Sequence, residues 1–527
     1  SLNFLYGGTL ESPIVNRGNI FLHQYDFYFP KRPPVGPPVV IKGKVESTQA
    51  YVSITAADLE VQNKIRAKKG TTLYVERLKY GADDLSSTGK LEILFRNGGI
   101  INAPLHSIGN ISVHTGNSNV TDTLEIVQPI HSEKGRVNVK AAKLKLKNKL
   151  IGIERHITVR DEFEYEPEEL YGTSPLRITC YQGGDVLKKT INNGADIHIE
   201  VPYGAPIPFT LINPVTAGYK PLDATTQPGP ANVLLDIKNG GLNKGLTGSP
   251  LIKSETGNVE LKLAEIDMIA LQCEAKNDVA LEIIPIWSRS SGITYGKFNL
   301  GDLAHPHKVS LKSGRNCFFK QTGSITTDAI DLTAHNDLLV NATTQWLNTS
   351  SKIKLGGTAH LQTPLNNHRL DSTQDFIAQR VEANGKTTFS FEQDGELPFV
   401  VNTMHDAIVN MHMKKLTVKH PIHSQEGEVL LSAFKLDIQN KISSRKGRFF
   451  SAVDIEYETD HLYDRSLLAL YFVDGGKIRK PLLNLGPIFI QSSLGSLPLT
   501  IEDNIIAGFS KDPTTTPAPD RAHLNIY

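Results

Sequence analysis

The sequence predicts an all-β protein with two homologous β-sandwich or barrel domains in tandem, an intervening small β-domain and few short helices. Three observations lead to this prediction: a long internal duplication, runs that alternate apolar with polar residues, and paired glycines between such runs. The chain has 527 residues, of which 39% are hydrophobic and 21% charged. This composition is ordinary for a soluble protein and supplies enough apolar material for a core in each copy.

The duplication begins at 129–132, where the sequence Pro-Ile-His-Ser returns at 421–424. The offset is 421 − 129 = 292 residues, and the two segments then match without a gap through Pro206 and Pro498. A period this long indicates tandem domains and not a solenoid of short repeats.

The duplication divides the chain into a first copy over 1–205, a small β-domain over 206–290, a second copy over 291–510 and a tail over 511–527. A proline-rich segment at 31–38 in the first copy is predicted to be an extended arm.

The repeated block is predicted to be β-structure with a β-bulge. Apolar residues take alternate positions from Val137 to Ala141, and the alternation resumes at Leu144 in the opposite parity. The second copy makes the same switch between Ala433 and Leu436. One extra residue at this place in each strand would keep both apolar sides facing inward.

Turns and helices follow from glycine and capping signals. Gly183-Gly184 and Gly475-Gly476 lie between apolar runs, which predicts a tight β-hairpin in each copy. The segment 372–385 starts with capping residues and ends in glycine, so it is the best helix candidate. A weaker helical pattern spans 55–70.

Two charged runs are candidates for binding. The acidic run is predicted to be an exposed strand face that pairs with lysines of a neighbouring strand, in preference to a divalent-cation site. The basic run lacks interleaved aromatic residues, so nucleic-acid contact is expected to be weak and passive at most. The second copy replaces three of the five lysines, so any role belongs to the first copy alone. The acidic run comprises Glu162, Glu164, Glu166, Glu168 and Glu169; the basic run comprises Lys140, Lys143, Lys145, Lys147 and Lys149.

Single histidines, tryptophans and cysteines receive structural interpretations. The repeated His131 and His423 are predicted to be turn histidines bonded to backbone, because no further metal ligands stand at a suitable spacing. The other histidines are predicted to be surface or core side chains, the tryptophans core side chains, and the cysteines free buried thiols. They are His405, His412 and His420; Trp287 and Trp346; and Cys180, Cys273 and Cys317.

No catalytic, cofactor-binding or metal-binding residue is predicted. The chain contains no nucleophile elbow, phosphate loop, dinucleotide fingerprint, zincin helix or calcium loop, so we expect a non-enzymatic protein without cofactors. The net charge of +1 provides no general attraction for nucleic acid or a membrane. The first residues lack the pattern of a signal peptide, so synthesis in a host cytoplasm is expected.

The duplicated β-domains resemble structural proteins of tailed-phage virions, particularly tail-tube and distal-tail ring proteins. The resemblance covers 90–205 and 385–500. It implies a structural protein that assembles with itself and other virion proteins, with three two-copy chains forming a pseudo-sixfold ring or tube. Two alternatives stay open, namely a double-barrel viral capsid protein and a carbohydrate- or receptor-binding β-adhesin.

Overall fold

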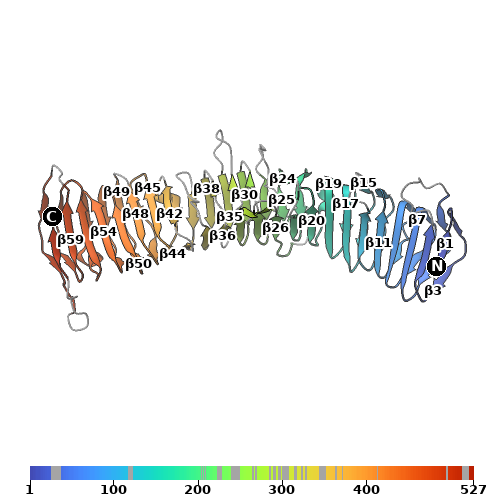
Figure 1. The fold of residues 1–527 in the computed structure, drawn as a ribbon, viewed down its shortest axis with the longest axis horizontal. Helices are drawn as coiled ribbons and strands as arrows, with labels where there is room; N and C mark the ends of the chain where they lie inside the picture. The colour runs from blue at the N-terminus through green and yellow to red at the C-terminus, as the bar shows by residue number, and fades with distance from the viewer. Residues whose placement is uncertain are drawn as a thin grey trace. The chain divides into compact units, whose positions relative to one another are not determined.

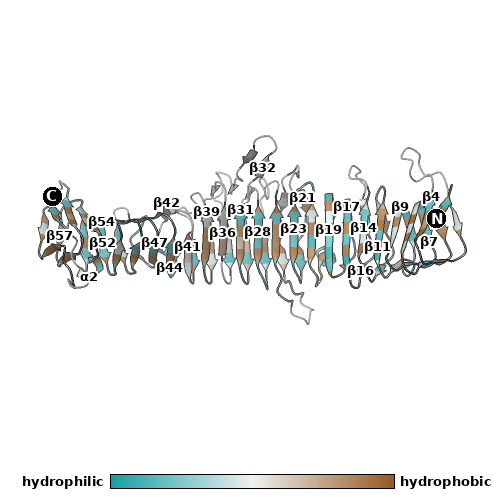
Figure 2. Cartoon of the chain, turned by 60° about the horizontal axis from the view of Figure 1, so that its bottom comes forward, coloured by the Kyte–Doolittle hydropathy of each residue, from teal (hydrophilic) through white to brown (hydrophobic). Residues whose placement is uncertain are grey.

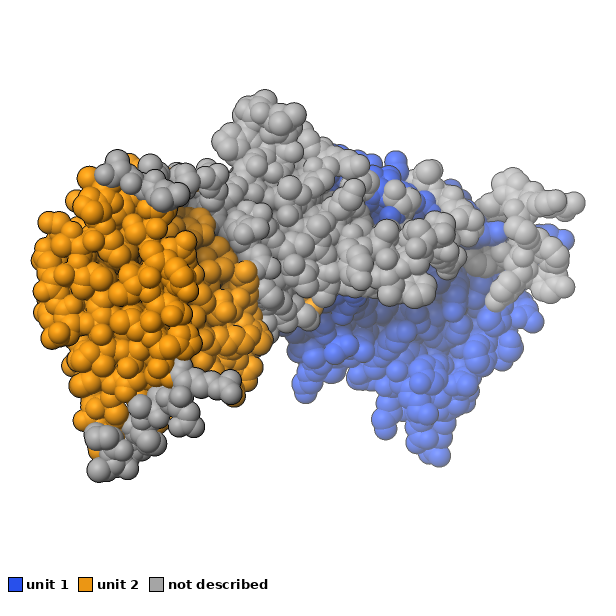
Figure 3. Space-filling model, turned by 60° about the vertical axis from the view of Figure 1, so that its left-hand side comes forward, with its two compact units in different colours: residues 1–266 blue, residues 267–527 orange. Residues whose placement is uncertain are grey.

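The chain folds as a parallel β-solenoid of about 18 turns over nearly its whole length, in a computed structural model (Figure 1). It forms two compact units, 1–266 and 267–527 (Figure 3). The fold-class prediction was therefore correct for all-β structure but wrong for tandem β-sandwiches or barrels. The structure describes 1–24, 37–116, 123–202, 205, 207, 209–221, 228–238, 250–263, short stretches between 266 and 370, 372–411, 414–493, 497–512 and 522–527.

In unit 1 the rungs stack through parallel pairing on three sides. The longest stack consists of β1 (Leu2–Phe4), β4 (Ile20–Gln24), β7 (Tyr51–Val61), β9 (Gly70–Tyr80), β11 (Lys90–Phe95), β14 (Ile111–Thr115), β17 (Arg136–Leu146), β19 (Glu154–Glu164), β20 (Leu176–Cys180), β23 (Ile197–Val201), β26 (Val233–Ile237) and β28 (Val259–Leu263).

Shorter strands form the other sides of unit 1. One side has β3 (Ile14–Asn16), β6 (Val45–Ser47), β8 (Ile65–Ala67), β10 (Ser86–Ser87), β13 (Leu105–Ser107), β16 (Ile130–Ser132), β18 (Leu150–Ile151), β22 (Ile191–Asn193), β25 (Val215–Ala217) and β27 (Leu251–Ser254). The other has β2 (Gly8–Leu10), β5 (Val39–Ile41), β12 (Gly99–Ile101), β15 (Thr123–Ile126), β21 (Gly184–Leu187) and β24 (Phe209–Leu211). Helix α1 (Pro167–Leu170) lies between β19 and β20.

Unit 2 repeats this plan. One stack consists of β42 (Leu365–Leu370), β45 (Thr387–Phe391), β48 (Ala407–Met411), β51 (Glu428–Ser432), β54 (Gly447–Ala452), β56 (Leu467–Phe472), β59 (Ile488–Ser492) and β62 (Leu524–Ile526). A second consists of β31 (Val279–Ile283), β36 (Cys317–Gln321), β39 (Leu338–Ala342), β41 (Thr358–Leu361), β44 (Arg380–Ala383), β47 (Val400–Thr403), β50 (Ile422–Ser424) and β53 (Ile442–Ser444). Two shorter stacks consist of β30 (Ala270–Ala275), β35 (Lys308–Ser313), β38 (Ala329–Ala334), β40 (Lys352–Leu355) and β43 (Phe376–Ile377), and of β46 (Gly395–Leu397), β49 (Lys415–Val418), β52 (Lys435–Ile438) and β55 (Asp454–Tyr457).

The remaining elements of unit 2 are short. They are the parallel pairs β57 (Gly476–Ile478) with β60 (Leu499–Ile501), β58 (Leu482–Asn484) with β61 (Ile505–Ala507) and β34 (Phe298–Asn299) with β37 (Ile325–Thr326); the antiparallel pair β32 (Ile286–Ser288) with β33 (Gly292–Thr294); and helix α2 (Thr459–Leu462).

The core consists of columns of apolar side chains that run from rung to rung. Alternation along each strand sends every second side chain inward, and parallel pairing stacks these positions (Figure 2). One column of unit 1 is fully buried and almost entirely β-branched or leucine, as expected for stacked strands. It contains Val139, Ile157, Ile178, Ile199, Leu235 and Leu261.

A serine-glycine corner sets the path of the backbone between two sides. The Ser132 hydroxyl donates to the carbonyl of Gly109 at 2.7 Å and accepts from the amide of Gly135 at 2.9 Å. A Cβ on Gly135 would lie 2.5 Å from the Asn110 nitrogen, so only glycine fits against the preceding rung. Ser107 makes the corresponding bond one rung earlier, to the carbonyl of Gly89 at 3.1 Å, and its hydroxyl also lies 2.8 Å from the carbonyl of Ser87.

Several predicted elements are wrong in this fold. Gly183, Gly184 and Gly475 do have positive φ angles, of 73°, 78° and 76°, but each glycine pair lies where two consecutive strands of one rung meet, β20 and β21 in the first copy and β56 and β57 in the second, instead of closing an antiparallel hairpin. The segment 372–385 holds one 3-10 turn, Thr373–Asp375, followed by β43 and β44. The segment 55–70 is part of β7 and β8, since its burial follows strand alternation.

The structure describes only part of two other predicted segments, the proline-rich arm and the tail. Residues 31–36 of the predicted arm and 513–521 of the tail lie outside the described residues. No helix among the described residues has the length and apolar character needed to cross a membrane.

Candidate functional site

The corner of unit 1 at β17 and β19 interrupts the regular ladder. The first half of β17 pairs with β14 and its second half pairs with β15, so this strand bends across two sides of the solenoid. Ala141 pairs with Val159 and Lys143 pairs with Glu162, which leaves Ala142 opposite two residues of β19. A β-bulge therefore lies where the sequence predicted it in the first copy. Its extra residue belongs to β19, however, and not to β17.

The second copy has no bulge, and the prediction of one there was wrong. Ser432 pairs with Ser451 and Lys435 with Asp454, so both pairs are 19 residues apart (451 − 432 and 454 − 435). Ala433 and Phe434 lie between β51 and β52 and do not shift the register.

Three one-residue differences are hidden in the apparently gapless duplication, and the last lies between Ser174 and Asn193, which are 193 − 174 = 19 residues apart against 484 − 466 = 18 for their counterparts Ser466 and Asn484. Leu150 to Arg155 spans five residues, whereas Ile442 to Arg448 spans six, so the first copy has a shorter turn. The extra residue of the β19 bulge restores the offset to 292. The bulge is thus an insertion specific to the first copy.

The bulge lies in a surface groove of about 510 Å³, which we call the bulge groove. It crosses four successive rungs, those of β14, β17, β19 and β20, or roughly 14 Å at the usual strand spacing. Ala142 is 6% exposed and contributes a small apolar surface to it. Its principal polar and aromatic lining is Thr115, Lys140, Thr158, Arg160, Tyr181 and Gln182.

The lining combines hydrogen-bond donors with an aromatic ring. Tyr181 is 48% exposed, and the Lys140 ammonium lies 5.8 Å from the centre of its ring. Arg160 is held by the neighbouring Asp161, with 2.8 Å between Nη2 and Oδ2. On the adjoining strand, burial lowers the pKa of His114 against the opposing effect of Glu92, and Lys140 lowers it further.

The second copy lacks the same groups. Ser432 stands at the position of Lys140, Phe434 at that of Ala142 and Val473 at that of Tyr181. A large aromatic side chain replaces the small one, and both the cation and the phenol ring are lost. The groove chemistry is therefore a property of the first copy.

The predicted pairing of the two charged runs is confirmed. The Lys143 ammonium lies 3.7 Å from the Glu162 carboxylate, and the Lys145 ammonium lies 3.1 Å from that of Glu164. Both pairs join register partners on β17 and β19. The other members are also placed: Lys147 pairs with Glu125, Glu166 with Lys189, Glu168 and Glu169 lie in α1, and Lys149 is exposed.

Among the described residues, no group of histidine, cysteine, aspartate or glutamate side chains could hold a metal ion. His131 and His423 lie on strands β16 and β50, not in turns as predicted. The His131 ring contacts the His106 ring edge-on, and the His423 Nδ1 lies 2.8 Å from the Ser443 hydroxyl.

The other predicted single residues divide as follows. Cys180, Cys273 and Cys317 are free and buried, as predicted, and burial raises the pKa of Cys180 and of Cys317 to about 12. His405 is exposed and His420 half-buried. His412, Trp346 and the side chain of Trp287 lie outside the described residues.

Sequence reasoning missed a buried arginine in each unit. Arg155 is 1% exposed, and its guanidinium donates to the carbonyls of Leu170 at 2.5 Å and Ser174 at 2.8 Å and to the Asn193 side-chain oxygen at 2.6 Å. It therefore satisfies the last carbonyl of α1 and ties two further segments to β19. Burial lowers the pKa of Arg155 to about 10.

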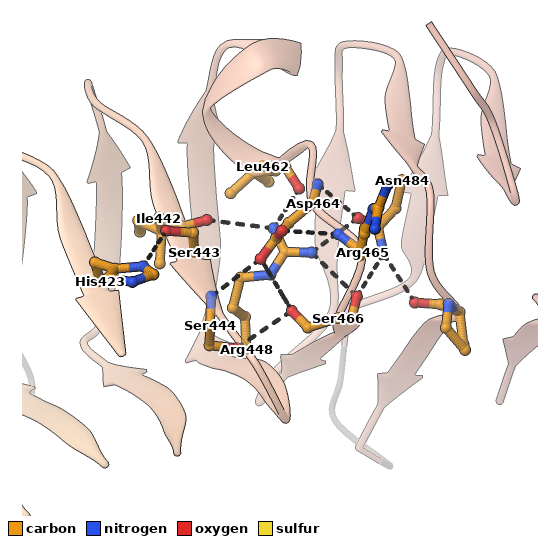
Figure 4. Close-up of polar contacts among 11 residues, drawn as sticks. His423, Ile442, Ser443, Ser444, Arg448, Leu462, Asp464, Arg465, Ser466 and Asn484 are labelled. Carbon is orange, nitrogen blue, oxygen red and sulfur yellow. Dashed lines mark hydrogen bonds and ion pairs between the residues drawn. The ribbon is translucent and has the colours of Figure 1, made fainter. Parts of the chain in front are cut away.

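Arg448 repeats this arrangement in unit 2 (Figure 4). It donates to the carbonyls of Leu462 and Ser466 and to the Asn484 side-chain oxygen, and Asp464 adds a carboxylate at 3.8 Å. These contacts use most of the donor positions of each guanidinium, so we assign Arg448 and Arg155 to the architecture of the rungs.

No protein-family model, curated protein or solved structure matches this chain.

Proposed function

We propose that the chain is a non-enzymatic binding protein whose stacked rungs present the bulge groove to a saccharide. The observation that carries the proposal is the half-exposed Tyr181 ring, which contacts Lys140 and shares the groove lining with Thr158 and the small Ala142. A sugar ring has an apolar face of C–H groups and a rim of hydroxyls. An aromatic surface surrounded by fixed polar groups complements both features.

The scaffold favours binding by preorganisation. Lys140 and Thr158 are register partners on paired strands, and Tyr181 follows directly after β20, which pairs with β19. Because these strands lie in a continuous ladder, the backbone positions that carry these side chains are fixed before a ligand binds. The groove also spans several rungs, which suits an oligosaccharide better than a single sugar ring.

The predicted pseudo-sixfold ring required each chain to contribute two globular β-sandwich domains. Both units of the chain are solenoids instead. We therefore do not propose the ring. Self-association of the chain stays a prediction, to be checked by native mass spectrometry at micromolar concentration.

A glycan array probed with the purified chain and with Ala142→Phe tests the proposal. This substitution installs the aromatic residue of the second copy at its matching position. We expect the wild type to bind a subset of oligosaccharides and the variant to lose all of them, while its melting temperature stays within a few degrees. Binding of no glycan by the wild type, or equal binding by both proteins, contradicts the proposal.

A further inference from the structure

Among the described residues, one positive charge in the bulge groove has no ion-pair partner. Arg160 and Lys140 are the charged residues among its lining, and Arg160 is neutralised by Asp161, whose oxygens lie 3.1 Å from its Nε. Lys140 forms no ion pair with another of the described residues. The next lysines of the basic run, Lys143 and Lys145, have partners on β19.

The Lys140 ammonium lies where it can contact a bound sugar. The ammonium of Lys140 lies over the Tyr181 ring, 5.8 Å from its centre, so a sugar that contacts the exposed part of that ring would hold its substituents close to the ammonium. A carboxylate or sulfate there would form a charge-assisted hydrogen bond, which is stronger than the bond to a neutral hydroxyl.

We infer that the bulge groove selects an anionic saccharide, one that carries a carboxylate or a sulfate group. The inference rests on the proposed function and adds the class of ligand to it. The second copy supports the assignment by contrast, because Ser432 and Val473 replace both the charge and the ring.

The test compares three ligands of equal length, a uronate oligosaccharide, a sulfated oligosaccharide and a neutral one, by isothermal titration calorimetry. We expect the wild type to bind at least one anionic ligand about tenfold more tightly than the neutral ligand, with a preference that falls as salt rises. Whichever anionic ligand binds better identifies the group. Equal or tighter binding of the neutral ligand overturns the inference.

Three variants separate this inference from the proposed function. Lys140→Ser should lose the anionic preference, so that the anionic and the neutral ligand bind within about twofold of each other, because the charge-assisted contact is removed. Lys145→Gln is the matched control and should keep the preference, because Lys145 pairs with Glu164 outside the groove. A preference unchanged in Lys140→Ser overturns the inference alone, whereas unchanged binding in Ala142→Phe overturns the proposed function as well.

Discussion

Arg155 and Arg448 occupy equivalent positions in the two units, although the gapless match of the duplication sets Arg155 against Gly447. Each guanidinium donates to a helix carbonyl, a serine carbonyl and an asparagine side-chain oxygen. The offset between counterparts is 448 − 155 = 293 for the arginines and 484 − 193 = 291 for the asparagines, so the duplicated segments preserve this set of contacts through several changes of length.

Arg155→Met should destabilise the protein by about 3 kcal/mol or more. Methionine keeps much of the side-chain volume but leaves the Leu170 carbonyl and the Asn193 side chain without their charged donor in the interior. Urea unfolding followed by circular dichroism measures the loss. Arg177→Met, at a partly exposed arginine of β20, is the control and should cost less than about 1 kcal/mol. Equal effects of the two substitutions would show that the buried contacts contribute little.

Gly135→Ala should destabilise unit 1 by about 1 to 3 kcal/mol. The added Cβ would lie 2.5 Å from backbone atoms of Gly109 and Asn110, which cannot move without disturbing the preceding rung. Gly229→Ala is the matched control, because a Cβ at Gly229 meets no atom within 4 Å. Thermal unfolding of both variants checks the expectation, and a melting temperature of Gly135→Ala equal to that of the control would contradict it.

The sequence contains a repeat of single rungs, but the 292-residue duplication made it hard to recognise. Leu-His-Ser at 105–107 precedes Ile-His-Ser at 130–132 by one rung, and the two strands are register partners. The rungs differ in length: register partners are 111 − 91 = 20 residues apart between β11 and β14 and 137 − 111 = 26 between β14 and β17. No fixed period is therefore visible, and the 292-residue duplication dominates.

What depended on local pattern could be predicted, and what depended on register could not. Strand alternation located the inward face of β17 and the exposed acidic face of β19, since both follow from side chains alternating along one strand. Pairing of that face with lysines was predicted, but the particular pair Lys143 with Glu162 depends on the register. The bulge groove required the residues opposite Ala142, which only the pairing of β17 with β19 reveals. Arg155 was missed because a one-residue difference in the preceding turn displaced it from Arg448 in the alignment.

Acid should destabilise unit 1 through His156 and His198. These half-buried residues flank Arg177 on adjacent strands, and both have a pKa lowered below 6.5 by burial and by the Arg177 charge. The unfolded chain therefore binds protons more readily, so stability is greatest above pH 6.5 and falls as pH drops through the folded-state values. Histidine titration by NMR should find both pKa values below 6.5 in the wild type and higher in Arg177→Gln. Values that do not move in the variant would remove Arg177 as a cause.

Deleting Asp161 should be tolerated by the fold yet abolish ligand binding. A one-residue deletion within a strand normally turns the following side chains to the wrong face. At the bulge it instead leaves one residue opposite Ala142, which restores the continuous register seen between β51 and β54 and between β52 and β55. We expect a melting temperature within a few degrees of the wild type and no binding to the glycans that the wild type binds, because the bulge that spreads the groove is gone. Deletion of Thr158 is the control: it lies in the regular part of β19, so its loss should shift the register there and unfold the rung. If the two deletions destabilise the protein equally, the bulge is required for folding, and its interpretation as an insertion made for binding fails.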